Sequence, residues 1–267
     1  MIEESIYAKF PEWYDYIYSQ GDIQESGPDL EFIQWFLTRK KLEPNNPEHM
    51  ILDMGSGTGR TLIPLTQQGY MIEGMEPFEG MIKASHKKAK QVNTKISVKI
   101  GSYQSLSALN EYQLIFGLND SMAYLLSSDE FLLAFRNIYA ALRPGGLFLA
   151  DMVNFYGLIK NYKYPEPRKL EIGGKKALLV LSHTIDLNRT TWIHHMRILL
   201  EEDKSDKKET VILHEDIHEL VMINLREIQF YAKMAGLEFV ENFQSYEDRP
   251  NDRKPGIRLI AVFQKPL

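Results

Sequence analysis

Apolar residues along the first 155 positions follow a pattern that predicts alternating strands and helices. Short apolar runs indicate five strands, at 50–54, 70–75, 96–100, 112–117 and 147–152. Apolar residues at helical spacing indicate helices between them, at 58–68, 78–92 and 131–142. Strands joined by helices predict a parallel sheet that is covered on both faces and, with right-handed crossovers, doubly wound.

The pattern differs on either side of this core. An aromatic-rich stretch at 10–18 and an apolar stripe at 32–37 predict two N-terminal helices. After residue 155, three strand-like runs predict an antiparallel meander, at 177–187, 190–200 and 209–221. A helix at 224–235, ended by Gly236, precedes two strands at 237–244 and 257–264 that we expect to pair antiparallel at the sheet edge.

These elements predict three parts of the chain. Residues 1–44 form an N-terminal helical cap, and residues 45–155 and 222–267 form the main α/β domain. Residues 156–221 form an antiparallel β insertion, which is too small to be an independent domain and which we expect to cover the ligand site of the main domain.

Composition narrows the class of protein. The chain has 267 residues, a formal net charge of −5 and no cysteine, so disulfides, thiolate catalysis and cysteine-ligated zinc are excluded. The charge balance makes a nucleic-acid partner unlikely. The N-terminus lacks the pattern of a signal peptide, and no apolar run is long enough to span a membrane. We therefore expect a cytoplasmic monomer or homodimer.

The most informative segment is a glycine-rich turn after the first strand of the core. Gly55, Gly57 and Gly59 stand in Ile-Leu-Asp-Met-Gly-Ser-Gly-Thr-Gly-Arg, where glycine permits positive φ and close approach of a ligand. The following helix offers its free N–H groups to an anion. Arg60 stands where a dinucleotide fold needs a small residue, and the Gly-Lys-Ser/Thr of a P-loop is absent. The spacing therefore favours a nucleoside over a pyrophosphate ligand.

An acidic residue follows at the end of the next strand. Glu76 lies 21 residues after Gly55, where a carboxylate can accept hydrogen bonds from both ribose hydroxyls. A solvated glutamate at a strand end is the alternative, and the adjacent glycine turn favours the ribose.

These residues together resemble a known family. Asp53-x-Gly55-x-Gly57-x-Gly59 resembles motif I of class I S-adenosylmethionine-dependent methyltransferases, and Glu76 matches their ribose-binding acid. The segment 142–149 resembles their motif at the fifth strand. The resemblance covers about residues 45–155 and implies a Rossmann-like sheet of seven strands in the order 3-2-1-4-5-7-6, with strand 7 antiparallel. It also implies S-adenosyl-L-methionine as the cofactor.

The resemblance and the sheet edge together define a cofactor site. Its expected residues are Tyr18, Asp53, Gly55, Ser56, Gly57, Gly59, Arg60, Glu76, Pro77, Ser102, Tyr103, Leu118 and Asn119. The family often has Gly-Asp after the third strand, whose aspartate accepts from the adenine amine. Here Gly101 is followed by Ser102, a weaker partner, so adenine would depend more on backbone N–H groups and stacking.

Polar residues after the fourth strand indicate the acceptor side. Ligands of open α/β sheets bind beyond the carboxyl ends of the strands, and Asp120 directly follows an apolar strand. The segment resembles the Asn-Ser-Phe-Ala-His-Leu stretch of glycine N-methyltransferases, with Asp120 on the Asn, Ser121 on the Ser and Tyr124 on the His. Sugar-amine N,N-dimethyltransferases have similar segments, an antiparallel insertion and a tyrosine-rich N-terminus. A small-molecule acceptor, an amine, is therefore expected.

Candidate catalytic residues have plain structural alternatives. Asp120 can orient an amine and take its proton, but aspartate is also a good helix N-cap. Tyr18 matches a cofactor-side tyrosine of the glycine enzyme, and Tyr14 is a second candidate whose ring can attract a sulfonium by about 0.5–2 kcal/mol. Both tyrosines can equally be part of an aromatic core.

Other functions remain as alternatives. An RNA or protein acceptor, an NAD(P)-dependent oxidoreductase and a non-catalytic binding module share the predicted fold. The Asn/Asp-Pro-Pro-Tyr/Phe run of enzymes that methylate base amino groups is absent. The insertion carries five histidines, His183, His194, His195, His214 and His218. His214 and His218 fall on one face of a strand, but no third ligand accompanies them, so no metal is expected. One of the five histidines can instead serve as a base near the acceptor.

Overall fold

A computed structural model describes residues 5–18, 27–160, 162–172, 175–204, 207–253 and 256–267. Its main sheet has seven strands: β1 (Ile51–Met54), β2 (Ile72–Glu76), β3 (Val98–Ile100), β4 (Tyr112–Gly117), β5 (Leu142–Val153), β10 (Glu238–Phe243) and β11 (Arg258–Gln264). The order is β10-β11-β5-β4-β1-β2-β3. β11 runs antiparallel to both neighbours, whereas β1 to β5 pair in parallel. The predicted fold class and strand order are confirmed.

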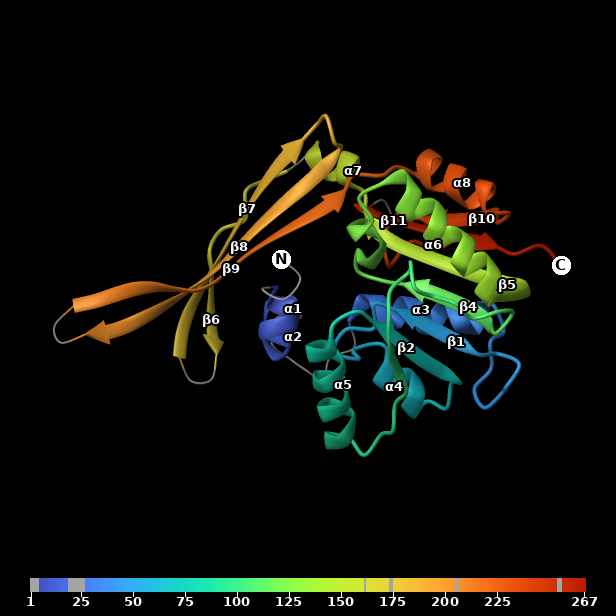
Figure 1. The fold of residues 1–267 in the computed structure, drawn as a ribbon, viewed down its shortest axis with the longest axis horizontal. Coiled ribbons are helices and arrows are strands. Elements are labelled where there is room, and N and C mark those ends of the chain that lie inside the picture. The colour runs from blue at the N-terminus through green and yellow to red at the C-terminus, as the bar shows by residue number, and fades with distance from the viewer. Residues whose placement is uncertain (1–4, 19–26, 161, 173–174, 205–206, 254–255) are drawn as a thin grey trace.

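Helices cover both faces of this sheet (Figure 1). One face carries α3 (Pro28–Arg39), α4 (Leu62–Gln67) and α5 (Glu79–Gln91). The other face carries α6 (Ser128–Ala141) and α8 (Leu225–Met234). The central strands β1 and β4 are buried almost throughout, because both of their faces pack against helices. The carboxyl ends of the parallel strands therefore form a fixed edge on which a site can be built.

The insertion forms a separate four-stranded antiparallel sheet. Its strands are β6 (Arg168–Ile172), β7 (Lys175–Asp186), β8 (Thr191–Lys204) and β9 (Lys207–Val221), and short helix α7 (Phe155–Ile159) leads into them. Figure 1 shows this sheet as a long arm beside the main domain. The N-terminal helices α1 (Ile6–Lys9) and α2 (Pro11–Tyr18) lie between it and α5.

The apolar face of the arm holds the N-terminal helices. Ile6 of α1 and Ile17 of α2 are buried against a patch on β7 and β8 that includes Leu179, Met196 and Ile198. Burial of each such side chain stabilises the contact by about 1.5–3 kcal/mol. The cap is therefore attached to the arm and is adjacent to the carboxyl ends of β1 and β4.

The structure differs from the predicted elements in a few places. The helix expected at 58–68 begins only at Leu62, because Gly59 has a φ of +82° and continues the glycine turn. Helices α1 and α7 and strand β6 were not predicted. Gly236 ends α8 with a φ of +93°, as expected of a C′ glycine. Within the ranges described, no helix has the length and apolar character needed to cross a membrane.

Candidate active site

The glycine turn after β1 has the conformation that its sequence predicts. Gly55, Gly57 and Gly59 have φ angles of +71°, +55° and +82°, in the left-handed region that disfavours residues with a Cβ. A Cβ on Gly57 would meet no other described atom closer than 3.9 Å. The backbone of the turn is thus open on one side, where a ligand can approach it.

Glu76 joins the turn to the end of β2. Its carboxylate accepts hydrogen bonds from the backbone N–H of Gly57 at 2.9 Å and of Phe78 at 3.1 Å. Each carboxylate oxygen has two lone pairs, so the group can still accept from ribose hydroxyls. The turn and the predicted ribose acid are therefore in direct contact.

Two buried carboxyl groups lie at this edge. Burial raises the pKa of Glu76 to about 7, although the two backbone hydrogen bonds to its carboxylate act to lower this pKa. Burial, reinforced by the charges of Glu76 and Asp29, raises the pKa of Asp53 to about 8, while Arg60 lowers it. Both carboxyls can thus hold a proton near neutral pH, and a cation or hydroxyl donor beside them would favour the ionised forms.

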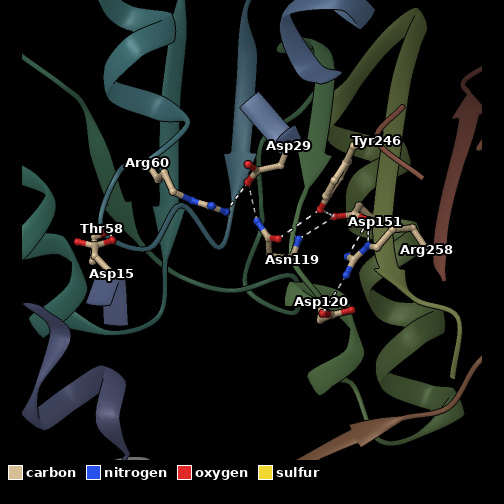
Figure 2. A network of polar contacts seen from close by, with 9 residues as sticks. All are labelled: Asp15, Asp29, Thr58, Arg60, Asn119, Asp120, Asp151, Tyr246 and Arg258. Carbon is tan, nitrogen blue, oxygen red and sulfur yellow. Dashed lines mark hydrogen bonds and ion pairs between the residues drawn. The ribbon is translucent and has the colours of Figure 1, made fainter. Parts of the chain in front are cut away.

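A polar network connects the carboxyl ends of β4 and β5 with β11 (Figure 2). Its centre is Asp151, which is fully buried at the end of β5. Its carboxylate accepts from Arg258 Nε at 2.7 Å, from Tyr246 Oη at 2.6 Å and from the backbone N–H of Asn119 at 2.9 Å. These bonds fix the chain directly after β4, where the acceptor segment begins.

Asn119 and Asp120 both adopt left-handed φ angles, of +50° and +68°. Asp120 occupies the N-cap position of the 3-10 helix η2 (Ser121–Tyr124) but makes no side-chain cap bond. Its carboxylate instead accepts from the backbone N–H of Val153 and lies 3.4 Å from Arg258 Nη1. The N-cap alternative for Asp120 is therefore wrong, because the side chain is held toward β5 and β11.

The N-terminal helices are tied to the glycine turn by polar contacts. Thr58 Oγ1 donates to Asp15 of α2 at 2.7 Å, and Lys88 of α5 donates to the same carboxylate at 2.8 Å. Arg60 pairs with Asp29 of α3. Arg60, which was expected at the cofactor, thus holds the third N-terminal helix against the turn (Figure 2).

Several predicted residues turn their side chains away from this edge. Ser56 Oγ is buried toward Gly74 and has no hydrogen-bond partner among the described atoms. The Tyr103 hydroxyl bonds Ser121 Oγ at 2.8 Å from within the core, and Leu118 is buried in the opposite cluster. Such residues can contribute to a site only through their backbone or by shaping it.

Four further predicted residues lie at the periphery or outside the described atoms. Pro77 is exposed directly after β2, and Ser102 is half-buried in a turn after β3. Tyr14 is half-buried, with its ring 5.6 Å from Tyr7 in an edge-on contact. Tyr18 ends α2, and its side chain lies outside the described residues.

Sequence reasoning missed the residues that hold the acceptor segment. Asp29, Asp151, Tyr246 and Arg258 come from α3, β5, the loop before β11 and β11 itself. The one local signal was Asp151, an acidic residue within the apolar run of β5.

Comparison with known proteins agrees with this geometry. Residues 51–146, from β1 into β5, match the family model of a methyltransferase domain. The chain therefore contains a segment that is similar to a methyltransferase domain. A curated relative from Geobacillus sp. (strain WCH70), named "Putative methyltransferase", is 28% identical over 154 residues, which are 56% of this chain. The chain matches only 58% of that relative's length.

Solved structures share the fold around the methyltransferase domain as well. An S-adenosylmethionine-dependent methyltransferase from Clostridium acetobutylicum is 16% identical, with a TM-score of 0.73 over 98% of this chain and 100% of that one. The sugar N-methyltransferase KedS8 from Streptoalloteichus sp. is 17% identical, with a TM-score of 0.70 over 95% of this chain and 93% of that one. The predicted resemblance to class I methyltransferases is confirmed.

Proposed function

We propose that this chain is an S-adenosylmethionine-dependent methyltransferase that methylates a small-molecule amine. The observation that carries the proposal is the hydrogen bond between Gly57 N–H and the Glu76 carboxylate, 2.9 Å long, at the carboxyl ends of β1 and β2. It joins a left-handed, open backbone turn to a buried acid that can accept from a ribose. The matched methyltransferase domain includes both residues.

Buried groups at the same edge fit such a cofactor. Asp29 Oδ1 is buried and has no hydrogen-bond partner among the described atoms. Asp53 is buried nearby with a raised pKa. An amino acid ammonium group would supply the missing donor and charge, because a buried acceptor without a partner costs about 1–3 kcal/mol. The open side of Gly57 would receive the nucleoside.

The bound cofactor would supply an activated methyl group on a sulfonium. The protein would then align the acceptor nitrogen with that methyl group and exclude water, and such alignment can lower a barrier by about 7–11 kcal/mol. We assign Asp120 and Tyr14 to the acceptor side and Tyr18 to the cofactor side. The sugar N-methyltransferase among the similar structures supports an amine as the acceptor.

The test is a methyl-transfer screen with S-adenosylmethionine that carries a labelled methyl group. Its acceptors are small amines, amino acids, amino sugars, bulk tRNA and a protein mixture. We expect labelled product with a small amine. Transfer only to tRNA or protein would refute the small-molecule acceptor while retaining the methyltransferase.

A variant of the acceptor segment separates binding from chemistry. Asp120→Ala should lose turnover yet bind S-adenosylhomocysteine in calorimetry, because the group lies beyond β4 rather than in the glycine turn. Full activity of this variant would remove Asp120 from the catalytic residues.

A further inference from the structure

Three histidines form a row across the arm, at a point next to the acceptor segment. His183 on β7 pairs in register with His194 on β8, and His194 pairs in register with His218 on β9. Directly opposed residues of neighbouring strands project on the same face of a sheet. The row therefore lies on one face, and His218 is its end nearest to η2.

Two tyrosine hydroxyls continue the row toward the predicted acceptor site. The Tyr124 hydroxyl of η2 lies 3.2 Å from His218 Nδ1, and the Tyr7 hydroxyl of α1 lies 2.7 Å from that of Tyr124. The Tyr7 ring also packs 5.3 Å from Phe78, two residues beyond the ribose acid Glu76. Tyr124 is 40% exposed, so part of its side chain can be reached by a ligand.

Tyr124 is also close to the glycine turn. It belongs to the same short helix as Ser121, whose Cβ would lie 2.8 Å from a Cβ on Gly55. The short helix that carries Tyr124 thus lies between the proposed cofactor site and the acceptor segment. A group at this position can contact an acceptor nitrogen.

Asp216 sets the protonation of the histidine. One of its oxygens lies 3.3 Å from His218 Nε2 and accepts from the backbone N–H of Ile6 at 2.7 Å. Burial opposes its ionisation, but the contacts with His218, Ile6 and His214 hold its pKa at about 2. An ionised carboxylate can only accept, so the His218 tautomer that fits this contact carries its proton on Nε2. Nδ1 is then free to accept from Tyr124.

The other groups facing His218 do not oppose a positive charge on it. The His194 ring lies 5.9 Å away, and burial together with the neighbouring histidines lowers its pKa to about 3, so it is neutral at pH 7. Tyr7 contributes its ring, 5.1 Å away, and Tyr124 its hydroxyl. Asp216 supplies the balancing negative charge, while His214 lies 3.5 Å from the same carboxylate.

We propose that Tyr124, His218 and Asp216 form the proton outlet of methyl transfer to an amine, an inference that rests on the proposed function. An acceptor amine arrives as an ammonium, and its nitrogen must release one proton before it can form its bond to the methyl carbon as the carbon–sulfur bond breaks. Tyr124 takes that proton from nitrogen and gives its own hydroxyl proton to His218 Nδ1. Asp216 stabilises the imidazolium. Tyr124 is the catalytic residue, and His218 and Asp216 act through it.

The kinetic test uses Tyr124→Phe and His218→Gln with labelled S-adenosylmethionine and a panel of amino sugars and amino acids. At pH 7 each variant should be about 100-fold slower in single turnover, the lower range for loss of a general base. The deficit should shrink as pH rises, because the amine then loses its proton to water. A deficit of equal size at every pH would overturn the proposal, since it would indicate structural damage only.

The matched control is His195→Gln. His195 adjoins His194 on β8 and pairs with Ile217, so its side chain lies on the opposite face of the arm. We expect wild-type rates from it at every pH. A loss equal to that of His218→Gln would overturn the proposal.

Two further measurements distinguish failure of the proton relay from failure of the proposed methyltransferase function. Nitrogen-15 NMR of the histidines should show neutral His218 protonated on Nε2, and protonation on Nδ1 would overturn the relay. Calorimetry with S-adenosylhomocysteine should give unchanged affinity in both variants. If the wild type methylates an amine and both variants match its rate at every pH, this inference fails alone. If the wild type methylates no amine or does not bind S-adenosylhomocysteine, the proposed function fails as well.

Discussion

Arg258 gives the sharpest test of how the acceptor segment is held. Its guanidinium is 14% exposed and contacts Asp151, which is 0% exposed, through two nitrogens at 2.7 Å. It also lies 3.4 Å from Asp120. Arg258→Met keeps an unbranched apolar stem but leaves a buried carboxylate without its cation. Breaking a buried pair in this way costs about 3–5 kcal/mol.

The control for this variant is an exposed pair of the same kind. Arg197 on β8 contacts Glu215 on β9 at 2.6 Å, and the two side chains are 54% and 44% exposed. Solvent screens such a pair, so Arg197→Met should cost no more than about 1 kcal/mol. Arg258→Lys should fall between the two, since it keeps the charge but loses the second nitrogen.

The assay is urea unfolding followed by far-UV circular dichroism and tryptophan fluorescence. Trp35 on α3 packs 5.6 Å from Phe243 of β10, so its emission reports on the main sheet. Arg258→Met should lower the unfolding midpoint far more than Arg197→Met. Equal midpoints for the two variants would refute the argument that Asp151 depends on Arg258.

Three other outcomes follow from buried groups of the main domain. The pKa of Glu76 is about 7, and the ionised carboxylate is the form that accepts from the ribose. Affinity for S-adenosylhomocysteine should therefore rise by up to about tenfold per pH unit between pH 5 and 7 and level off above pH 7. Calorimetric affinity that does not change with pH would contradict an ionised ribose acid. Gly117→Ala would set a Cβ 1.9 Å from the Tyr103 hydroxyl and should cost about 1–3 kcal/mol in urea unfolding, partly recovered by adding Tyr103→Phe. Lys88→Met removes the cation beside buried Asp15 and should speed amide exchange in α2; unchanged exchange would show that the contact does not hold the cap.

The sequence correctly predicted strands in which nearly every residue is buried. β4 was predicted within its observed bounds, because a continuous apolar run ending in Gly117 indicates a central strand buried on both faces. β6 escaped prediction because it is a largely exposed edge strand with only two apolar residues, Leu170 and Ile172. The strand order was available only from the family resemblance, since periodicity alone carries no information on which strands are neighbours.

The candidate site was predictable only where it is local in sequence. Gly55, Gly57 and Glu76 are close together along the chain and form a recognisable spacing. Asp29 and Arg258 stand near opposite ends of the chain, and only the position of β11 beside β5 brings them into one network. The histidine row depends on the register of three strands, and its contact with Tyr124 depends on how the arm lies against η2.

Calorimetry of S-adenosylhomocysteine binding tests the central claim most directly, with Gly57→Val as the decisive variant and Gly145→Val as the control. Both glycines have left-handed φ, +55° and +77°, but Gly145 lies at the start of β5, away from the carboxyl ends. We predict one bound molecule per wild-type chain, no binding of NADH, loss of binding in Gly57→Val and retained binding in folded Gly145→Val. Wild-type protein that does not bind S-adenosylhomocysteine, or a Gly57→Val variant that binds it as tightly as the wild type, would contradict the account.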